Sequence, residues 1–192
     1  MGTDEVKQDR ARRTHELLLD SAAAEFVLHG FAGTNLSDVA ARSRVTKGAL
    51  YGHFDSKAEL AEELTRGFEE EWGKLLAPSG SSPGSLRELT VGLARRMDED
   101  VRFAAGLRLT ADAARVSRRE PVPFGELRVR LVELIRDAQC EGRIDARHRP
   151  EVLARFVVAV LMGAHATRWS GAEEVGELWD LVLCALEARG AP

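Results

Sequence analysis

The stretch SRVTKGALYGHF, residues 43–54, decides how the sequence is interpreted. It combines two glycines, two cations, a tyrosine and a histidine, and it contains no acidic residue. A helical hairpin with a purely structural role needs none of these polar groups on its surface. The reason for this composition must therefore come from the residues on either side.

Two short helices are expected around this stretch. Asn35 is a good N-cap for the first, and Asp38 follows where a carboxylate meets the free N–H groups of a helix end. Thr46 can cap the second, which runs from Lys47 to about Gly52. The residues that pack the two helices together are apolar: Leu36, Val39, Ala40, Val45, Ala49 and Leu50. Two short helices joined by a tight turn, behind a preceding helix, predict a helix-turn-helix.

Donor side chains occupy the surface that these packing residues leave free. Lys47 is placed to enter the major groove and to donate to guanine, and Gly48 lets the backbone come close to a base or a phosphate. Tyr51, His53 and Lys57 can donate to phosphate oxygens, which fixes the register without reading sequence. For any single residue, an ordinary solvated position is an equal alternative, but the set favours DNA. The candidate DNA-binding residues are Thr34, Asn35, Arg44, Thr46, Lys47, Gly48, Tyr51, His53 and Lys57.

The rest of the chain is also typical of helices, without sustained strand alternation. A first helix is expected from about Arg10 to Leu28, with Gly30 ending it. A capping box of Ser56 and Glu59 starts a fourth helix that reaches about residue 76. Residues 77–85, rich in Gly, Ser and Pro, form the clearest linker. Further helices are expected over residues 86–103, 105–117, 124–141, 150–170 and 172–188. The predicted fold class is all-α.

Composition indicates a soluble, globular, cytoplasmic chain. Of 192 residues, 44% are hydrophobic and 30% charged, and the net charge is −4. That charge excludes a wholly basic coat protein, yet residues 42–57 contain four cations and one acid. No stretch approaches the roughly 18 apolar residues of a membrane span, and the start lacks the apolar region of a secretory signal. Cys140 and Cys184 stand far apart without a CxxC pattern, so neither a disulfide framework nor a cysteine zinc site is expected.

The residues from about Arg10 to Leu64 resemble the DNA-binding domain of the tetracycline-repressor (TetR) family of bacterial regulators. The matching positions are Phe26, Gly30, Phe31, Gly33, Thr34, Val39, Ala40, Thr46, Lys47, Gly48, Leu50, Tyr51, His53, Phe54, Lys57 and Leu60. The resemblance implies a homodimer on a pseudo-palindromic operator in double-stranded DNA, released by a small effector. It divides the chain into a helix-turn-helix DNA-binding domain (1–56) and a ligand-binding and dimerisation domain (57–192).

The second domain is expected to hold a dimer interface and a pocket. The resemblance implies that the last two helices pair with their copies, along a stripe of Val157, Leu161, Ala164 and Arg168 in the first of them. Monomer core is the alternative for both helices. The other helices are expected to enclose a mainly apolar pocket. Its candidate residues, each with core packing as an open alternative, are Phe68, Trp72, Met97, Phe103, Leu107, Phe124, Leu127, Leu131, Phe156, Met162, His165 and Trp169.

Residues 46–54, 101–113 and 138–165 resemble the γ-butyrolactone receptors of Streptomyces-type actinomycetes, which repress antibiotic pathways until a lactone signal arrives. Those receptors carry a tryptophan, a glutamine and a threonine where this chain has Phe124, Phe68 and Met162. A buried lactone carbonyl or hydroxyl without a partner costs about 1–3 kcal/mol. The departure favours the pseudo-receptor type, which senses antibiotics or their intermediates, and a true γ-butyrolactone receptor is the alternative.

Two other classes of function stay open at this point. A small helical enzyme has little support, because the five histidines show no HExxH spacing and the sequence has no G-x-S-x-G, P-loop or dinucleotide motif. No cofactor and no metal are expected. A protein-interaction module that reuses the helix-turn-helix without DNA would not show salt-dependent binding to a palindromic duplex. The sequence therefore predicts a non-enzymatic transcriptional repressor that regulates antibiotic biosynthesis and has no membrane partner.

Overall fold

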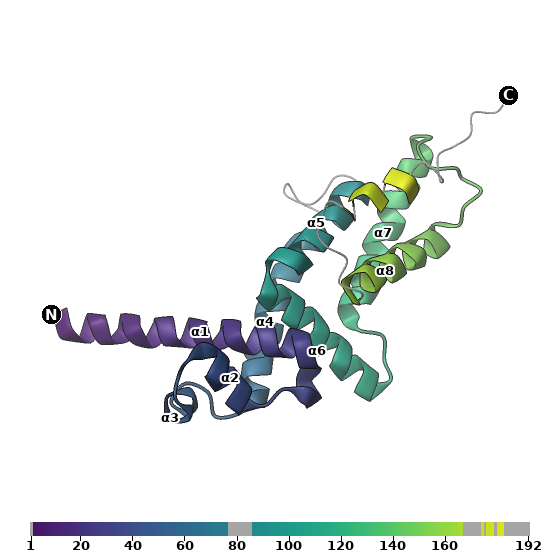
Figure 1. Cartoon of the computed structure of the whole chain (residues 1–192). Coiled ribbons are helices and arrows are strands. Elements are labelled where there is room, and N and C mark those ends of the chain that lie inside the picture. Colours follow the sequence, from purple (N-terminus) through teal and green to yellow (C-terminus); the bar gives the residue numbers. More distant parts are fainter. Residues whose placement is uncertain (1, 77–85, 167–173, 175, 179, 183–192) are drawn as a thin grey trace. The chain divides into compact units, whose positions relative to one another are not determined.

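The computed structural model describes residues 2–76, 86–166, 174, 176–178 and 180–182. The described helices are α1 (Gly2–Gly33), α2 (Leu36–Ser43), α3 (Lys47–Tyr51), α4 (Lys57–Leu76), α5 (Leu86–Glu99), α6 (Val101–Ser117), α7 (Val122–Cys140) and α8 (Pro150–Ala166) (Figure 1). No strand occurs among the described residues, so the all-α prediction is confirmed. The predicted linker at 77–85 and most of the last predicted helix lie outside the described residues.

Several helix boundaries differ from the sequence expectation. Helix α1 begins at Gly2 rather than near Arg10, and Gly30 bends it instead of ending it, with φ 67° and ψ −179°. The prediction of one helix over residues 86–103 is wrong. Helix α5 ends at Glu99, and α6 begins at Val101, because Asp100 between them has an extended backbone conformation. The Asp100 carboxylate accepts the N–H groups of Arg102 and Phe103, both at 3.0 Å, and so caps the start of α6.

The chain packs as two compact units. Unit 1 contains residues 1–71 and 100–119, and unit 2 contains residues 72–99 and 120–192. Helices α1, α2, α3 and α6 therefore belong to unit 1, and α5, α7 and α8 belong to unit 2. Helix α4 crosses the boundary within its own length. These packing units cut the chain at other places than the predicted functional division at residue 56, which stays a prediction.

The core of unit 1 holds the helix-turn-helix in place. Leu18, Ala22 and Phe26 of α1 are fully buried. They share one apolar cluster with other residues of α1, with residues of α2, α3, α4 and α6, and with Phe54 between α3 and α4. The other members of the cluster are Leu19, Ala23, Val39, Ala40, Leu50, Leu60, Ala61, Leu64, Ala105 and Leu109. Since Ala105 and Leu109 come from α6, that helix is an integral part of unit 1, although the chain reaches it only after α5.

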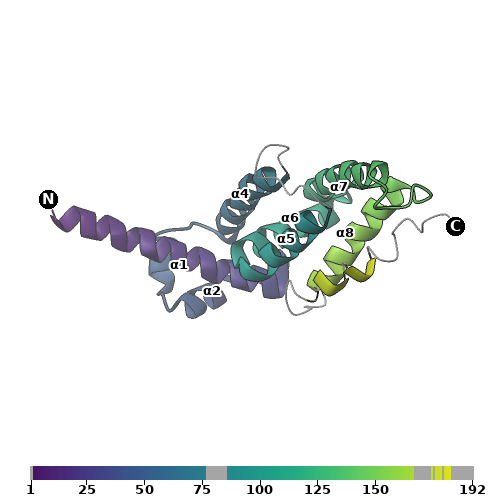
Figure 2. The same cartoon turned by 90° about the horizontal axis from the view of Figure 1, so that it is seen from above.

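Unit 2 is built from helices that pack along one another. Helix α7 packs most extensively on α8, and α5 contacts both (Figure 2). Val157 and Leu161 of α8 are buried within this unit, with 2% and 1% of their surface exposed. The prediction that these two residues face a partner copy is therefore wrong, and Ala164 and Arg168 lie outside the described side chains. No described helix is long and apolar enough to cross a membrane.

Candidate DNA-binding surface and its supports

The turn between α2 and α3 is fixed by caps on both sides. Asn35 caps α2 by accepting the N–H of Asp38 at 3.0 Å, and the Thr46 hydroxyl caps α3 by accepting the N–H of Ala49 at 3.2 Å. Between them, Arg44 adopts the left-handed conformation with φ 54°, and its N–H reaches the last carbonyls of α2. This is the backbone geometry that ends a helix and turns the chain sharply. The predicted helix-turn-helix geometry is thus present.

The outer side of α3 carries the polar residues expected from the sequence. Leu50 is buried with 1% exposed and anchors the helix, whereas Tyr51 is 55% exposed. Lys47 and Gly48 are exposed as well, and His53 is half-buried. A Cβ added at Gly48 would meet no atom within 4 Å, so nothing inside the protein requires glycine there. The structure therefore leaves the side of α3 around Lys47 and Gly48 open to a partner.

Two predicted DNA contacts have partners inside the protein instead. Thr34 is buried with 2% exposed, and its hydroxyl donates to the carbonyl of Gly30 at 2.8 Å. The ammonium of Lys57 donates to the carbonyls of Phe31 and Thr34 at 2.7 and 2.8 Å, and it lies 4.6 Å from the centre of the Phe31 ring. Lys57 therefore joins the start of α4 to the corner between α1 and α2. A phosphate contact by its remaining proton stays a prediction.

Arg42, one of the cations of the sequence patch, is paired with a buried acid. Its Nε donates to the carboxylate of Glu25 at 2.6 Å, and only 7% of the Glu25 side chain is exposed. His29 approaches the same carboxylate at 3.6 Å. Because a buried carboxylate needs partners, Arg42 stabilises the packing of α2 on α1.

We expect Arg42→Ala to lower the free energy of unfolding by about 1–3 kcal/mol, because it leaves the Glu25 carboxylate short of a donor. Urea unfolding followed by circular dichroism measures this change. Arg12→Ala is the matched control, since its pair with Asp9 is exposed on both sides (73% and 55%) and should contribute less than about 1 kcal/mol. Equal midpoints for the two variants would show that the Glu25 pair adds nothing.

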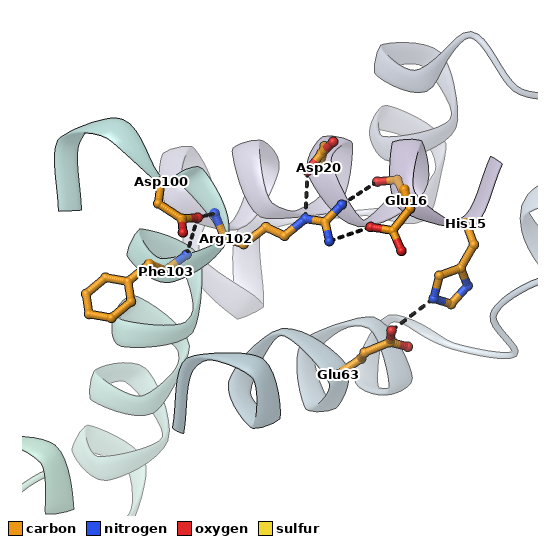
Figure 3. A network of polar contacts seen from close by, with 7 residues as sticks. All are labelled: His15, Glu16, Asp20, Glu63, Asp100, Arg102 and Phe103. Atoms are coloured by element: carbon orange, nitrogen blue, oxygen red, sulfur yellow. Dashed lines mark hydrogen bonds and ion pairs between the residues drawn. The ribbon is translucent and has the colours of Figure 1, made fainter. Parts of the chain in front are cut away.

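Polar contacts between α1 and α6 reinforce unit 1 along the length of both helices. Arg102 donates to Asp20 at 2.7 Å and to the Glu16 carbonyl at 2.9 Å, and it forms an ion pair with the Glu16 carboxylate at 2.7 Å (Figure 3). Partial burial lowers the pKa of Arg102, but the hydrogen bonds to Asp20 and Glu16 outweigh it and leave the pKa raised. Arg108 donates to the Val27 carbonyl at 2.7 Å.

The bend in α1 provides the last contact of this series. The N–H of Phe31 donates to the Asp112 carboxylate at 3.3 Å. A Cβ at Gly30 would lie 2.7 Å from the same carboxylate oxygen, and the positive φ also favours glycine there. Sequence reasoning missed Arg102, Arg108 and Asp112, because their partners are about eighty residues away and no local signal marks them.

A second contact cluster joins α1 to the end of the helix-turn-helix. His15 Nε2 lies 2.9 Å from the Glu63 carboxylate of α4 (Figure 3). The His15 ring stacks on Phe54 with 4.7 Å between ring centres and approaches the His53 ring at 6.0 Å. His53, predicted to donate to phosphate, is therefore positioned beside α1 at the corner between α3 and α4.

The candidate pocket residues are distributed over both units. In unit 1, Phe68 packs edge-on against Phe103 at 5.0 Å, and Leu107 is buried. In unit 2, Trp72 is buried, and its indole N–H donates to Glu126 at 3.1 Å. Phe156 is 48% exposed and is not part of the core. The others of unit 2 are buried (Met97, Leu127, Leu131) or half-buried (Phe124, Met162), while the His165 side chain and Trp169 lie outside the described residues. Ligand contact by this set stays a prediction.

The capped helices α2 and α3 and the turn between them make unit 1 a helix-turn-helix DNA-binding unit. In the described part of the chain, no group of His, Cys, Asp or Glu can hold a metal ion. Residues 18–64 match the family model for bacterial regulatory proteins of the tetR family. The chain belongs to the TetR family of transcriptional regulators and resembles its actinomycete receptor branch.

Similar proteins cover nearly the whole chain. The A-factor receptor protein of Streptomyces griseus is 28% identical over 96% of this chain and 68% of its own length. A crystal structure of a γ-butyrolactone receptor (ArpA-like protein) superposes with a TM-score of 0.72 at 27% identity, over 94% of this chain and 91% of the other. CprB of Streptomyces coelicolor, solved with its biological operator sequence, gives a TM-score of 0.71 at 28% identity over 90% and 88%.

Proposed function

We propose that this protein is a repressor that binds a pseudo-palindromic operator as a homodimer and is released by a small apolar effector. The exposed side of α3 carries the proposal. Lys47 and Tyr51 present donors there, and the exposed Arg44 adds one from the turn before α3. Gly48 leaves the backbone accessible. The predicted packing residues are buried or half-buried except Ala49, which is exposed, so the prediction that Ala49 packs the two helices together is wrong. Exposed donors on the second helix of such a pair are what major-groove recognition requires. The known operator complex of CprB supports DNA as the partner.

A homodimer would place two α3 helices in successive major grooves, about 34–36 Å apart. The exposed side of α8 supports this assembly. Val152 and Phe156 are 54% and 48% exposed, and Ala159 and Gly163 follow on the same side. Steps of four, three and four residues are typical of helices that pair lengthwise. This stripe replaces the one that the sequence had suggested for the interface.

Release would proceed through α4. This helix crosses from unit 2 into unit 1 between Glu71 and Trp72. Its first residue, Lys57, binds the carbonyls of Phe31 and Thr34 at the corner of the helix-turn-helix. A rotation of α4 would therefore move the corner between α1 and α2, and with it the orientation of α3. The effector releases DNA only if it binds the rotated state more tightly than the DNA-bound state.

We propose an antibiotic or a biosynthetic intermediate as the effector. Phe68, Phe124 and Met162 offer no hydrogen-bond donor to a lactone, which supports an apolar molecule. The second candidate is a γ-butyrolactone, favoured by the names of the similar A-factor and γ-butyrolactone receptors. The proposed site of action is the cytoplasm, where the DNA is, and catalysis has no part in the proposal.

The proposal is tested by selecting bound duplexes from a random library and titrating the selected operator by gel shift. We expect Lys47→Ala to weaken operator binding by about 1–3 kcal/mol, roughly 5- to 150-fold, and to relax one base preference. Arg95→Ala, an exposed cation on α5, is the control and should bind like the wild type. Failure to enrich any sequence, or equal binding by Lys47→Ala, would contradict the proposed reading surface.

The complex of the protein with the selected operator is also used to identify the effector, as the molecule that releases the DNA. Release by extracts of an antibiotic-producing actinomycete, but not by synthetic γ-butyrolactones, is the expected result. Release by a γ-butyrolactone would instead show a true receptor of that signal, whose polar groups come from other residues than Phe68, Phe124 and Met162.

A further inference from the structure

The first turns of α1 form an exposed extension that the helix-turn-helix does not need for packing. Residues 6–13 are all exposed. In Figure 1 the N-terminal part of α1 projects beyond α2 and α3, and Figure 2 shows it projecting beyond α2. The helix-turn-helix contacts α1 at His15, through the rings of Phe54 and His53. A helical segment without packed neighbours is only marginally stable by itself. A bound partner would stabilise the helical conformation of these residues.

Cations outnumber acids in the part of this extension whose side chains the structure describes, which the acids Asp4 and Glu5 precede in the sequence. Residues 6–15 contain four cations and one acid. That acid, Asp9, is paired with Arg12 at 3.1 Å, and the next acid along the helix, Glu16, is paired with Arg102. The side chains of Lys7, Arg10 and Arg13 form no ion pair or hydrogen bond with any described side chain from residue 6 onward. No described side chain therefore compensates the positive charge of these three side chains.

These three cations are arranged along the helix in a way that suits a polyanion. Lys7, Arg10 and Arg13 follow one another at intervals of three residues, which brings them to one side of α1. With a rise of about 1.5 Å per residue, they stand roughly 3–12 Å beyond His15, the residue that contacts the α3–α4 corner. A DNA duplex carries one phosphate charge per about 1.7 Å of its axis. Long flexible side chains at these distances can reach phosphates beside the segment that α3 would occupy.

We propose that Lys7, Arg10 and Arg13 form a second DNA contact, which binds the phosphate backbone next to the bases read by α3. This inference rests on the proposed DNA-binding function and extends the interface along α1. Such a contact adds affinity and salt dependence and does not read sequence. Binding to the duplex would also stabilise the helical conformation at the exposed start of α1.

The test compares the double variant Arg10→Gln/Arg13→Gln with Arg95→Gln/Arg149→Gln, which removes the same charge from two exposed positions of unit 2. Binding to the selected operator and to an unrelated duplex is measured over a range of salt concentrations. We expect the first variant to lose about tenfold or more in affinity on both duplexes, with a salt slope lower by about two per subunit. The control should keep the wild-type slope. Thermal melting should be equal for both, because neither pair of side chains is packed.

Each other outcome has a separate meaning. An unchanged salt slope in Arg10→Gln/Arg13→Gln, with normal operator binding by the wild type, would overturn the second contact and leave the proposed function intact. A loss confined to the operator would also overturn it, because phosphate contacts act on every duplex. If the wild type itself bound no duplex in a salt-dependent manner, both the second contact and the proposed function would fall.

Discussion

Replacing Gly106 with alanine will lower the free energy of unfolding by about 3 kcal/mol, the upper end of what an overpacked core site usually costs. Helices α4 and α6 cross at this residue. A Cβ at position 106 would lie 2.2 Å from Cβ and 2.8 Å from Cγ of Phe68, and 3.0 Å from the carbonyl oxygen of Leu64. Neither the Cβ of Phe68 nor a backbone carbonyl can move without its helix, so α4 must shift away from α6.

The measurement is urea unfolding of the full chain, with two glycine variants as controls. Gly67 of α4 and Gly92 of α5 also stand inside helices, but a Cβ at either meets nothing within 4 Å. Gly67→Ala and Gly92→Ala are therefore expected to raise stability by about 0.5–1 kcal/mol, the ordinary gain from removing a helical glycine. A gain of that size in Gly106→Ala would show that α4 and α6 do not approach so closely.

The features that could be predicted from the sequence are those with local causes. Asn35 and Thr46 accept the hydrogen bonds expected of N-caps, and Ser56 accepts the N–H of Glu59 at 3.2 Å. Each cap involves residues three positions apart, so neighbouring letters are enough to predict it. The helix-turn-helix, most of its buried residues and the exposed donors of Lys47 and Tyr51 follow from such short-range patterns.

The features that were missed depend on distant partners. Asp100 was read as part of a helix although it is a good N-cap, because the apolar pattern on both sides is continuous. Lys57 looks like a free cation at a helix start, yet its partners are backbone carbonyls 23 and 26 residues earlier in the chain. Gly106 cannot be told from Gly67 or Gly92 in the sequence, since only the crossing of α4 and α6 distinguishes it. The place of α6 in the DNA-binding unit has the same cause.

Gly48→Ala is expected to separate DNA binding from stability. Within the protein the change is favourable, because a Cβ at Gly48 meets no atom within 4 Å and alanine is the better helix former, so stability should rise by about 0.5–1 kcal/mol. On the operator the added methyl group stands on the side of α3 that carries Lys47. If the α3 backbone touches a base edge or a phosphate there, affinity should fall by tenfold or more, a loss of about 1.4 kcal/mol.

Both effects are measured on the same preparation, by urea unfolding and by fluorescence anisotropy with the selected operator. Gly73→Ala is the matched control: its Cβ also meets nothing within 4 Å, but it lies in α4, away from the reading residues, so it should gain stability and keep its affinity. Wild-type affinity in Gly48→Ala would mean that the α3 backbone stays at least a methyl group's width from the duplex. Recognition would then depend on the long side chains of Lys47 and Tyr51, and the glycine would need another explanation. A loss of affinity with a gain in stability would instead show that Gly48 is kept for what α3 approaches, at a measurable cost to the fold.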